Sequence, residues 1–346
     1  MVSESTLHST VSPSTATARI TDARTAPCFV VQNAGSGRQE PALAEAALER
    51  ALVSAGRAHR LWRVSGSSAL RAAAREAVEA ARAAQGMVVA AGGDGTVNLV
   101  VDAALGKSCP VGVLPQGTFN FFARTHGIPD DVDAAIRVLL DGSVRHVQVG
   151  LVNEHVFLVN ASLGLYPQLI EDREAYYQSQ AGRHRITALW AGLGTLLREH
   201  RQLRLQLEKD GGSLHTLRTP TVFVGNNRLQ LERIGIAEAA DVDAGRLAVM
   251  ALRPVGTWEM LGLLLRGALG RLGDADQVLS FSAEELTVRP ARRYGMARAK
   301  VAIDGEIAWV KTPLRFRVAP QRLALVAPPP APGPRDERSP PGSAVP

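Results

Sequence analysis

The segment Met87–Leu99 (MVVAAGGDGTVNL) constrains the fold more than any other part of the chain. Its first five residues are apolar and predict a buried strand, and apolar side chains then recur at helical spacing until Gly106. A strand, a glycine turn and a helix form the geometry of a phosphate site, because glycines expose backbone N–H groups and a helix N-terminus carries positive dipole. We expect Thr96 to cap the helix and Asp94 to hold a carboxylate beside the phosphates, where a magnesium ion or a reacting hydroxyl needs one.

The turn Gly92–Thr96 has a simpler alternative, which is an ordinary tight connection in an open sheet. It combines three glycines with an aspartate and a threonine, which is more than such a connection requires. It carries neither of the common nucleotide fingerprints, Gly-x-Gly-x-x-Gly or the Gly-Lys-Ser/Thr of a P-loop. The turn therefore predicts a phosphate site of another kind.

Two further glycine-containing turns follow apolar runs in the first half of the chain. Cys28–Val31 leads into Gln32–Gly37, and Val111–Leu114 leads into Pro115–Asn120. Strands that alternate with helices over short loops predict a parallel, doubly wound sheet whose ligands bind beyond the carboxyl ends of the strands. Three such turns at one sheet edge therefore indicate a nucleotide phosphate site. The remaining elements expected here are a strand at Arg60–Val64 and helices at Pro41–Ser54, Ala69–Ala84 and Val132–Leu140.

After Ser143 the pattern changes to strands with an alternation of period two. Asp210-Gly211-Gly212 and Asp304-Gly305 are hairpin signals. This half is expected to be an antiparallel β-sandwich or flattened barrel. The expected strands are Val144–Gly150, His155–Ser162, Leu203–Leu207, Leu217–Gly225, Arg246–Leu252, Glu285–Arg289, Arg298–Ile303, Ile307–Val310, Leu314–Val318 and Leu323–Val326.

Two apolar helices flanked by arginines interrupt the second half, at Arg185–His200 and about Trp258–Leu269. They either face the core with their arginines extended to solvent, or form an amphipathic surface that touches a membrane or receives an acyl chain.

Composition supports an intracellular protein of two domains. The chain has 346 residues, 46% of them hydrophobic, and a formal net charge of +6 that suits anionic phospholipid or phosphate. No basic motif interleaved with aromatics points to nucleic acid, and Cys28 and Cys109 read as buried small residues. With neither a secretory signal nor a membrane span in the sequence, we expect a cytoplasmic location, peripheral at the inner membrane face. Residues 1–26 and the Pro-rich 327–346 are expected to be disordered.

The ordered set of motifs resembles the diacylglycerol kinase catalytic-domain family, particularly its bacterial lipid kinases. A Gly-Gly-Asp-Gly turn alone also occurs in phosphofructokinases and NAD kinases, so the specificity lies in the whole set, which spans residues 27–326. The motifs are Asn33-Ala34-Gly35-Ser36-Gly37, GGDGTVN at Gly92–Asn98, PQGTFN at Pro115–Asn120, Gly225-Asn226-Asn227 and Asp304-Gly305-Glu306.

The resemblance implies an α/β nucleotide domain over 27–143, a β-sandwich lipid-substrate domain over 144–326 whose last strand can return to the first, and an active site between them. It implies transfer of the γ-phosphoryl group of ATP to a lipid hydroxyl with Mg²⁺. Glu306 is the expected proton acceptor, since a carboxylate after a tight hairpin can be held stiffly in a cleft, and Asp94 is the second catalytic candidate. The expected nucleotide-binding residues are Asn33, Ser36, Gly37, Ser65, Gly92, Gly93, Asp94, Gly95, Thr96, Val97, Asn98, Leu99, Gly117, Thr118 and Asn120.

The chain departs from the family pattern at several positions. Many members carry Glu where Leu99 stands and Asp where Phe121 stands, and a magnesium loop read as Asp-Asp-Gly is here Asp243-Ala244-Gly245. Ala244 cannot bind a metal, which leaves Asp243, or else Asp241, as the candidate ligand. Arg228–Glu232 replaces a glycine cluster, which bears on the identity of the substrate.

Two other functions stay open on the sequence. One is a kinase of a soluble acceptor such as NAD or a sugar phosphate. The other is a lipid or nucleotide sensor with a decayed site, which Leu99 and Ala244 favour. The expected partners are a lipid substrate and an anionic membrane surface, with a homodimer among the possible oligomeric states.

Overall fold

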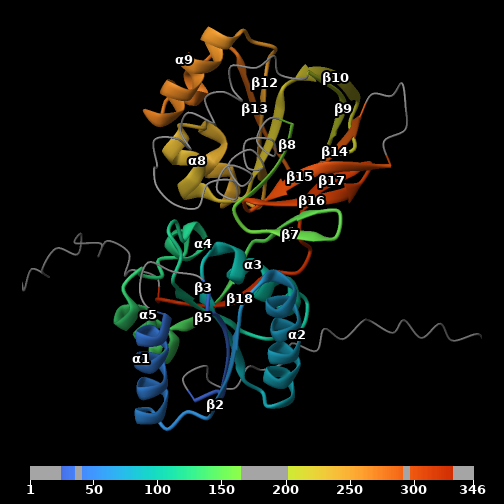
Figure 1. Cartoon of the computed structure of the whole chain (residues 1–346). Helices are drawn as coiled ribbons and strands as arrows, with labels where there is room; N and C mark the ends of the chain where they lie inside the picture. Colours follow the sequence, from blue (N-terminus) through green and yellow to red (C-terminus); the bar gives the residue numbers. More distant parts are fainter. Residues whose placement is uncertain (1–24, 36–40, 165–201, 291–296, 330–346) are drawn as a thin grey trace, which may run out of the picture.

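The structure, a computed structural model, describes residues 25–35, 41–164, 202–290 and 297–329. Figure 1 shows two lobes, an α/β lobe below and a β-sandwich above. Ser36, Gly37, the expected helix Arg185–His200 and nearly all of the expected disordered termini lie outside the described residues.

The first lobe is built on a six-stranded sheet of order β2-β1-β3-β4-β18-β5. β1 to β4 are parallel, and α1 and α5 cover one face while α2 and α3 cover the other (Figure 1). The doubly wound sheet is confirmed, and Met87–Ala91 is the fully buried strand that its apolar run predicts. The elements are β1 (Cys28–Asn33), α1 (Pro41–Ser54), β2 (His59–Val64), α2 (Ser67–Ala83), β3 (Met87–Gly92), α3 (Asp94–Ala104), β4 (Val111–Pro115), α4 (Phe121–Thr125), α5 (Val132–Asp141), β5 (Ser143–Val147) and β18 (Leu323–Ala327).

One strand of the first sheet, β18, comes from far along the chain and is the last strand that the resemblance expects to return to the first lobe. β18 pairs in parallel with β4 and antiparallel with β5. The expected strand Val144–Gly150 is therefore wrong as one unit, because its first residues lie in β5 and Gly150 begins a strand of the sandwich. Cys28 and Cys109 are buried free thiols, and burial raises the pKa of each to about 11.

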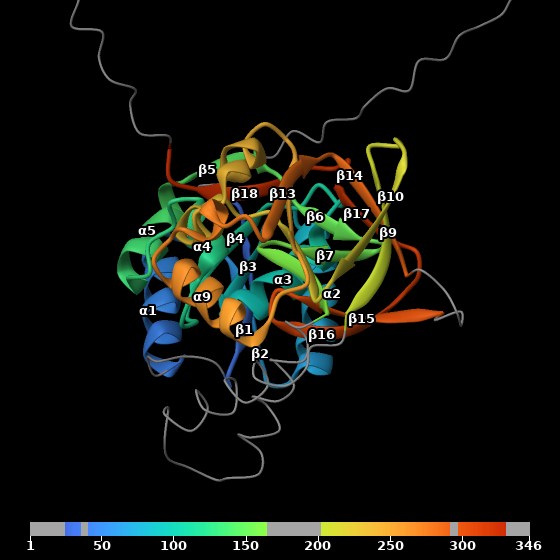
Figure 2. The same ribbon diagram turned by 90° about the horizontal axis from the view of Figure 1, so that it is seen from above.

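The second lobe consists of two six-stranded antiparallel sheets packed around an apolar core (Figure 2), which confirms the sandwich. Both predicted hairpins are present, with Asp210, Gly211, Asp304 and Gly305 all at positive φ. One sheet contains β10 (Leu214–Thr219), β9 (Leu203–Lys209), β14 (Glu285–Pro290), β17 (Leu314–Val318), β6 (Gly150–Val152) and β7 (His155–Phe157). The other contains β13 (Val278–Ala283), β12 (Leu247–Leu252), β11 (Thr221–Gly225), β8 (Asn160–Gly164), β15 (Arg298–Ile303) and β16 (Glu306–Lys311).

The sandwich also carries α8 (Arg228–Ile234), α9 (Thr257–Ala268) and the short helices η1 (Ala237–Val242) and η2 (Leu272–Asp274). α9 is amphipathic: Met260 and Leu263 are buried, whereas Trp258 is 83% exposed. Within the described ranges, no helix is both long enough and apolar enough to cross a bilayer.

Candidate active site

The carboxyl ends of β1 and β3 are joined by side chains of their turns. Asn33 Nδ2, at the end of β1, donates to Thr96 Oγ1 at 3.4 Å. Thr96 is buried against Gly92, where a Cβ would lie only 2.5 Å from its hydroxyl oxygen. The expectation that Thr96 caps α3 is wrong, because the N-cap is Gly93 and no side chain bonds to it.

The turns after β3 and β4 press together backbone to backbone. A Cβ built on Gly117 would lie 2.7 Å from the Cα of Gly93, so only glycine permits this approach. Asn120, at φ 48°, accepts a hydrogen bond from the N–H of Gly117 at 2.9 Å and donates to Asp130 at 2.9 Å. The Asn120 side chain is therefore engaged in shaping its own loop.

Asp94 caps the short helix α4. Its two carboxylate oxygens accept the backbone N–H groups of Phe121 and Phe122, each at 3.2 Å. Burial raises the pKa of Asp94, and these backbone hydrogen bonds oppose that shift. The carboxylate thus ties the turn after β3 to the turn after β4.

The other predicted nucleotide residues fall into two groups. Ser65 and Thr118 are exposed beyond β2 and β4, and within the described residues neither side chain makes a hydrogen bond. Val97 and Leu99 are buried in α3. Phe121, one of the positions that depart from the expected family pattern, stacks on Phe119 with ring centroids 5.6 Å apart.

A hollow of about 220 Å³ lies where α3 meets the hairpin of β15 and β16. Gly95, Asn98 and Leu99 line it from the first lobe, and Asp304 and Glu306 line it from the sandwich. A Cβ built on Gly95 would lie 3.1 Å from Glu306 Oε1, so the carboxylate rests against the first turn of α3. The structure therefore brings Glu306 to the glycine turn, while Asp94 and Thr118 do not line this hollow.

Asp304, two residues before Glu306, connects the two lobes through hydrogen bonds. Its carboxylate accepts four hydrogen bonds, from Asn98 Nδ2 at 2.8 Å and from the backbone N–H groups of Leu158, Val159 and Asn160 at 2.7–2.9 Å. Burial raises the pKa of Asp304, and the four donors oppose that shift. Asp304 was predicted only as part of a hairpin and of the Asp304-Gly305-Glu306 motif, and neither signal predicts its contact with Asn98 of the other lobe.

A second contact between the lobes uses Asn227. It caps α8 by accepting the N–H of Gln230, accepts the Thr125 hydroxyl at 2.9 Å, and donates to the Phe121 carbonyl at 3.2 Å. The Gly225-Asn226-Asn227 motif therefore positions the sandwich on α4.

Three further polar side chains that line the hollow were not predicted. Arg71 of α2 pairs with Asp102 of α3 at 3.7 Å and is a cation at this hollow, and His155 follows the β6–β7 turn. No pattern in the sequence singles them out, because Arg71 and Asp102 lie on different helices and His155 belongs to no motif.

The residues present do not fit a resident magnesium at Asp243. Its carboxylate is exposed and lies 2.6 Å from the Arg228 guanidinium, which competes with any cation. Within the described residues no group of three or more His, Cys, Asp or Glu side chains could hold a metal ion.

The comparisons with known proteins agree with this architecture. The diacylglycerol kinase catalytic domain matches residues 27–152, and the YegS C-terminal NAD kinase beta sandwich-like domain matches residues 175–327. A solved diacylglycerol kinase structure from Bacillus anthracis is similar in fold, with a TM-score of 0.62 at 16% identity, over 88% of this chain and 97% of its own.

Curated relatives match the chain more locally. Diacylglycerol kinase of Bacillus subtilis is 34% identical over 142 residues, 40% of this chain and 46% of its own. "Probable lipid kinase YegS-like" of Cronobacter sakazakii is 38% identical over 96 residues, 27% of this chain and 32% of its own. The chain thus spans between a third and a half of these relatives. With both domain matches in their expected order on the same two lobes, the chain belongs to the diacylglycerol kinase catalytic-domain family.

Proposed function

We propose that the protein transfers the γ-phosphoryl group of ATP to the hydroxyl of a lipid alcohol held between the lobes. The observation that carries this proposal is the carboxylate of Glu306 resting against Gly95 at the start of α3. Phosphoryl transfer depends on positioning and charge stabilisation more than on covalent chemistry, and this arrangement pairs a proton acceptor with a phosphate-binding helix start.

In the proposed reaction the Glu306 carboxylate takes the proton of the lipid hydroxyl. The hydroxyl oxygen forms a bond to the γ-phosphorus, and the bond from that phosphorus to the β–γ bridging oxygen breaks, which releases ADP. The backbone at Gly93–Gly95 and the hydroxyls of Ser65 and Thr118 bind the phosphates. Asp94 and Asn120 act as positioning residues, because their side chains hold the turns rather than the nucleotide. Magnesium enters with ATP, as part of the substrate, and offsets phosphate charge.

The lipid half of the proposal is supported by α9. Trp258 and Leu265 are 83% and 63% exposed, and Arg266 and Arg271 lie close by in the chain. Exposed aromatic and aliphatic side chains beside arginines suit the boundary between water and anionic lipid. We propose that the protein reaches its substrate at such a surface.

Incubation with labelled ATP, magnesium and a panel of lipids tests this function. We expect one lipid class, among diacylglycerol, sphingoid bases and phosphatidylglycerol, to become labelled. Glu306→Gln is expected to lower the initial rate by about 100- to 10,000-fold, the usual range for loss of a general base. Glu49→Gln, an exposed carboxylate on α1, is the matched control and keeps full activity.

Three outcomes contradict the proposal. Labelling of a soluble acceptor instead of lipid makes the protein a kinase of small molecules. ATP binding without turnover makes it a sensor. Full lipid labelling by Glu306→Gln removes Glu306 from the chemistry.

A further inference from the structure

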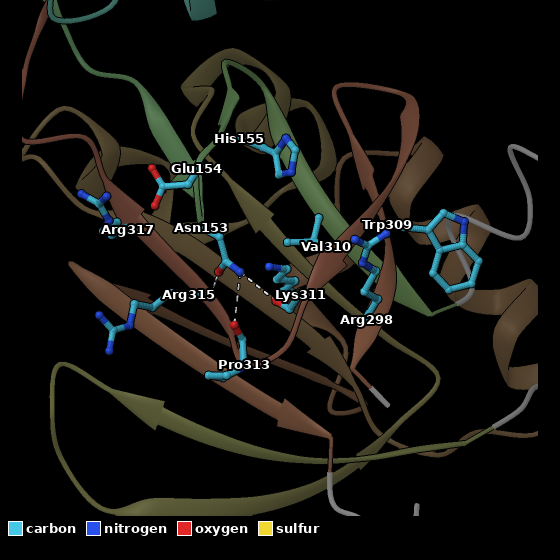
Figure 3. A pocket seen from close by; sticks show the side chains of 10 residues that line it. All are labelled: Asn153, Glu154, His155, Arg298, Trp309, Val310, Lys311, Pro313, Arg315 and Arg317. Carbon is cyan, nitrogen blue, oxygen red and sulfur yellow. Dashed lines mark hydrogen bonds between the residues drawn. The ribbon is translucent and has the colours of Figure 1, made fainter. Parts of the chain in front are cut away.

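A second hollow, of about 610 Å³, opens on the sandwich and is not lined by any residue of the glycine turns (Figure 3). It lies at the connection between β16 and β17, with the β6–β7 turn beside it. Four cationic side chains and one acidic side chain line it, together with His155 and Trp309. The cations are Arg298, Lys311, Arg315 and Arg317, and the acid is Glu154.

Hydrogen bonds of Asn153 fix the backbone that carries the cations of this hollow, which we call the basic hollow. Asn153, at φ 52°, donates from Nδ2 to the carbonyls of Lys311 and Pro313 at 2.8 and 3.3 Å, and its Oδ1 accepts the N–H of Arg315 at 2.7 Å. Figure 3 shows this amide at the centre, with Arg315 and Arg317 on one side and Arg298 and Trp309 on the other. The cations therefore stand on fixed backbone.

The cations of the basic hollow are largely uncompensated. Within the described ranges the side chains of Arg298, Lys311 and Arg317 make no hydrogen bond or ion pair, and Arg315 reaches only Glu285 at 3.6 Å. Arg298 stands directly opposite Lys311 across the β15–β16 ladder, and like charges in that position repel each other. A bound anion removes this repulsion.

The shape and chemistry of the hollow favour a phosphate attached to a larger polar body. Arginine forks bind phosphate oxygens in pairs, and a volume of about 610 Å³ is that of a typical small-molecule site. Trp309, 58% exposed, offers an amphipathic wall at the rim. We propose that this basic hollow is a second anion site, separate from the ATP site, that binds a phosphate-bearing polar group.

The basic hollow and the candidate active site share structural parts. His155 lines both, and β16 carries Glu306 at one end and Lys311 at the other, about 17 Å apart at the usual rise of a strand. The phosphate can come from the headgroup of a membrane lipid or from a soluble phosphate compound. Binding itself does not depend on catalysis.

Binding to the full chain tests this site in two arms at constant ionic strength. One titrates inorganic phosphate by calorimetry against a chloride reference. The other measures cosedimentation with phosphatidylcholine vesicles with and without phosphatidylglycerol. The test variant is Arg298→Gln/Lys311→Gln. The matched control is Arg50→Gln/Arg137→Gln, which removes two exposed charges from α1 and α5 of the other lobe.

We expect the test variant to weaken binding about tenfold or more in at least one arm, or to remove one phosphate site from the stoichiometry, while the control matches wild type. Loss in the phosphate arm alone identifies a soluble ligand, loss in the vesicle arm alone identifies a headgroup, and loss in both arms supports a phosphate site that accepts either source. Equal losses in test and control variants, unchanged binding in the test variant, or no binding above the references overturns the proposal. Circular dichroism melting confirms that both variants fold, and Glu306→Gln should bind like wild type.

Discussion

The turns of the first lobe and the β15–β16 hairpin of the sandwich face each other, and they use their polar side chains in opposite ways. We call these two regions the rim of the first lobe and the rim of the sandwich. On the rim of the first lobe, Asp94 is bonded to the backbone of the neighbouring turn after β4, and Asn120 is bonded to the backbone of its own loop. On the rim of the sandwich, the half-buried Asp304 accepts four hydrogen bonds, while Glu306, two residues later, makes no hydrogen bond or ion pair within the described part of the chain. One rim is thus a shaped backbone surface, and the other presents a free carboxylate.

This difference separates residues that build a site from a residue that can react in it. A carboxylate held by several N–H donors is stabilised as an acceptor and is unavailable to a substrate. An exposed carboxylate on a tight hairpin is available and still well positioned. Of the two carboxylates predicted to be catalytic, the geometry favours Glu306 for proton transfer and Asp94 for positioning.

The sharpest test of the comparison sets Glu306→Gln against Asp94→Asn. The first should lower the rate of phosphoryl transfer by about 100- to 10,000-fold and leave the melting temperature unchanged. The second should lower the free energy of unfolding by about 1–2 kcal/mol, because an amide cannot accept both N–H groups of α4. Initial rates and denaturant melts measure both. A large loss of stability in Glu306→Gln would break the distinction between the rims.

The next largest effect is expected at Asp304. In Asp304→Asn, an amide N–H₂ replaces one carboxylate oxygen, so N–H donors that this oxygen accepts in the wild type lose their acceptor. We expect this loss to lower the free energy of unfolding by about 2–4 kcal/mol. Asp210 is a matched control, since it also stands at positive φ and accepts two backbone N–H groups, those of Glu284 and Glu285, but lies at the surface. Asp210→Asn should cost less, because water can satisfy its freed donors. Equal costs would show that the connection between the lobes through Asp304 adds nothing.

Lowering the pH should reduce the free energy of unfolding through His126, which follows α4 in the first lobe. Burial and the nearby Arg145 lower the pKa of His126 to about 4, below the ordinary 6.5. As the pH falls, His126 therefore binds a proton in the unfolded state before it does so in the folded state. Its contribution to the free energy of unfolding is complete above pH 6.5 and falls by about 3 kcal/mol as the pH drops to 4. Urea melts across this window measure the slope. His126→Gln should flatten it, whereas the exposed His215→Gln should not.

The smallest effect is expected from Gly95→Ala. The new methyl lies 3.1 Å from Glu306 Oε1 and displaces the carboxylate, which should slow transfer by about tenfold. Stability should stay level or rise, since alanine favours α3 over glycine by up to about 1 kcal/mol. Gly262→Ala on α9 meets no neighbouring atom and should change only stability. An unchanged rate of phosphoryl transfer in Gly95→Ala would contradict the proposal that the contact of Glu306 with the glycine turn matters for the reaction.

Sequence reasoning predicted many of the local elements because they depend on local signals. It was wrong where it joined two strands of different sheets into one, at Val144–Gly150, His155–Ser162 and Leu217–Gly225. The predicted helix Pro41–Ser54 has the bounds of α1, and the apolar run Met87–Ala91 lies in β3. Both hairpins follow from Asp-Gly pairs at positive φ. The short α4 and α8 were not predicted, because helices of so few residues give no periodic signal.

What the sequence could not give were contacts across long separations. Thr96 was assigned to a cap because it follows a turn, but Asn33, 63 residues earlier, is the side chain it meets. Asp304 bonds Asn98 over a separation of 206 residues, and no local pattern encodes that pairing. The pattern of apolar residues indicates where a strand ends. The packing of the two lobes decides which polar side chains at the strand ends remain without a hydrogen bond.

The position of β18 has a consequence for how the protein is made. This strand, Leu323–Ala327, fills the sheet between β4 and β5, although the whole sandwich separates it from them in the chain. A ribosome that releases the first lobe delivers a sheet in which the place between β4 and its edge strand β5 is still empty, and β18 fills that place only after the sandwich has emerged. The first lobe is thus the first to be synthesised and the last to be completed, and a truncation that removes β18 leaves its sheet without one strand.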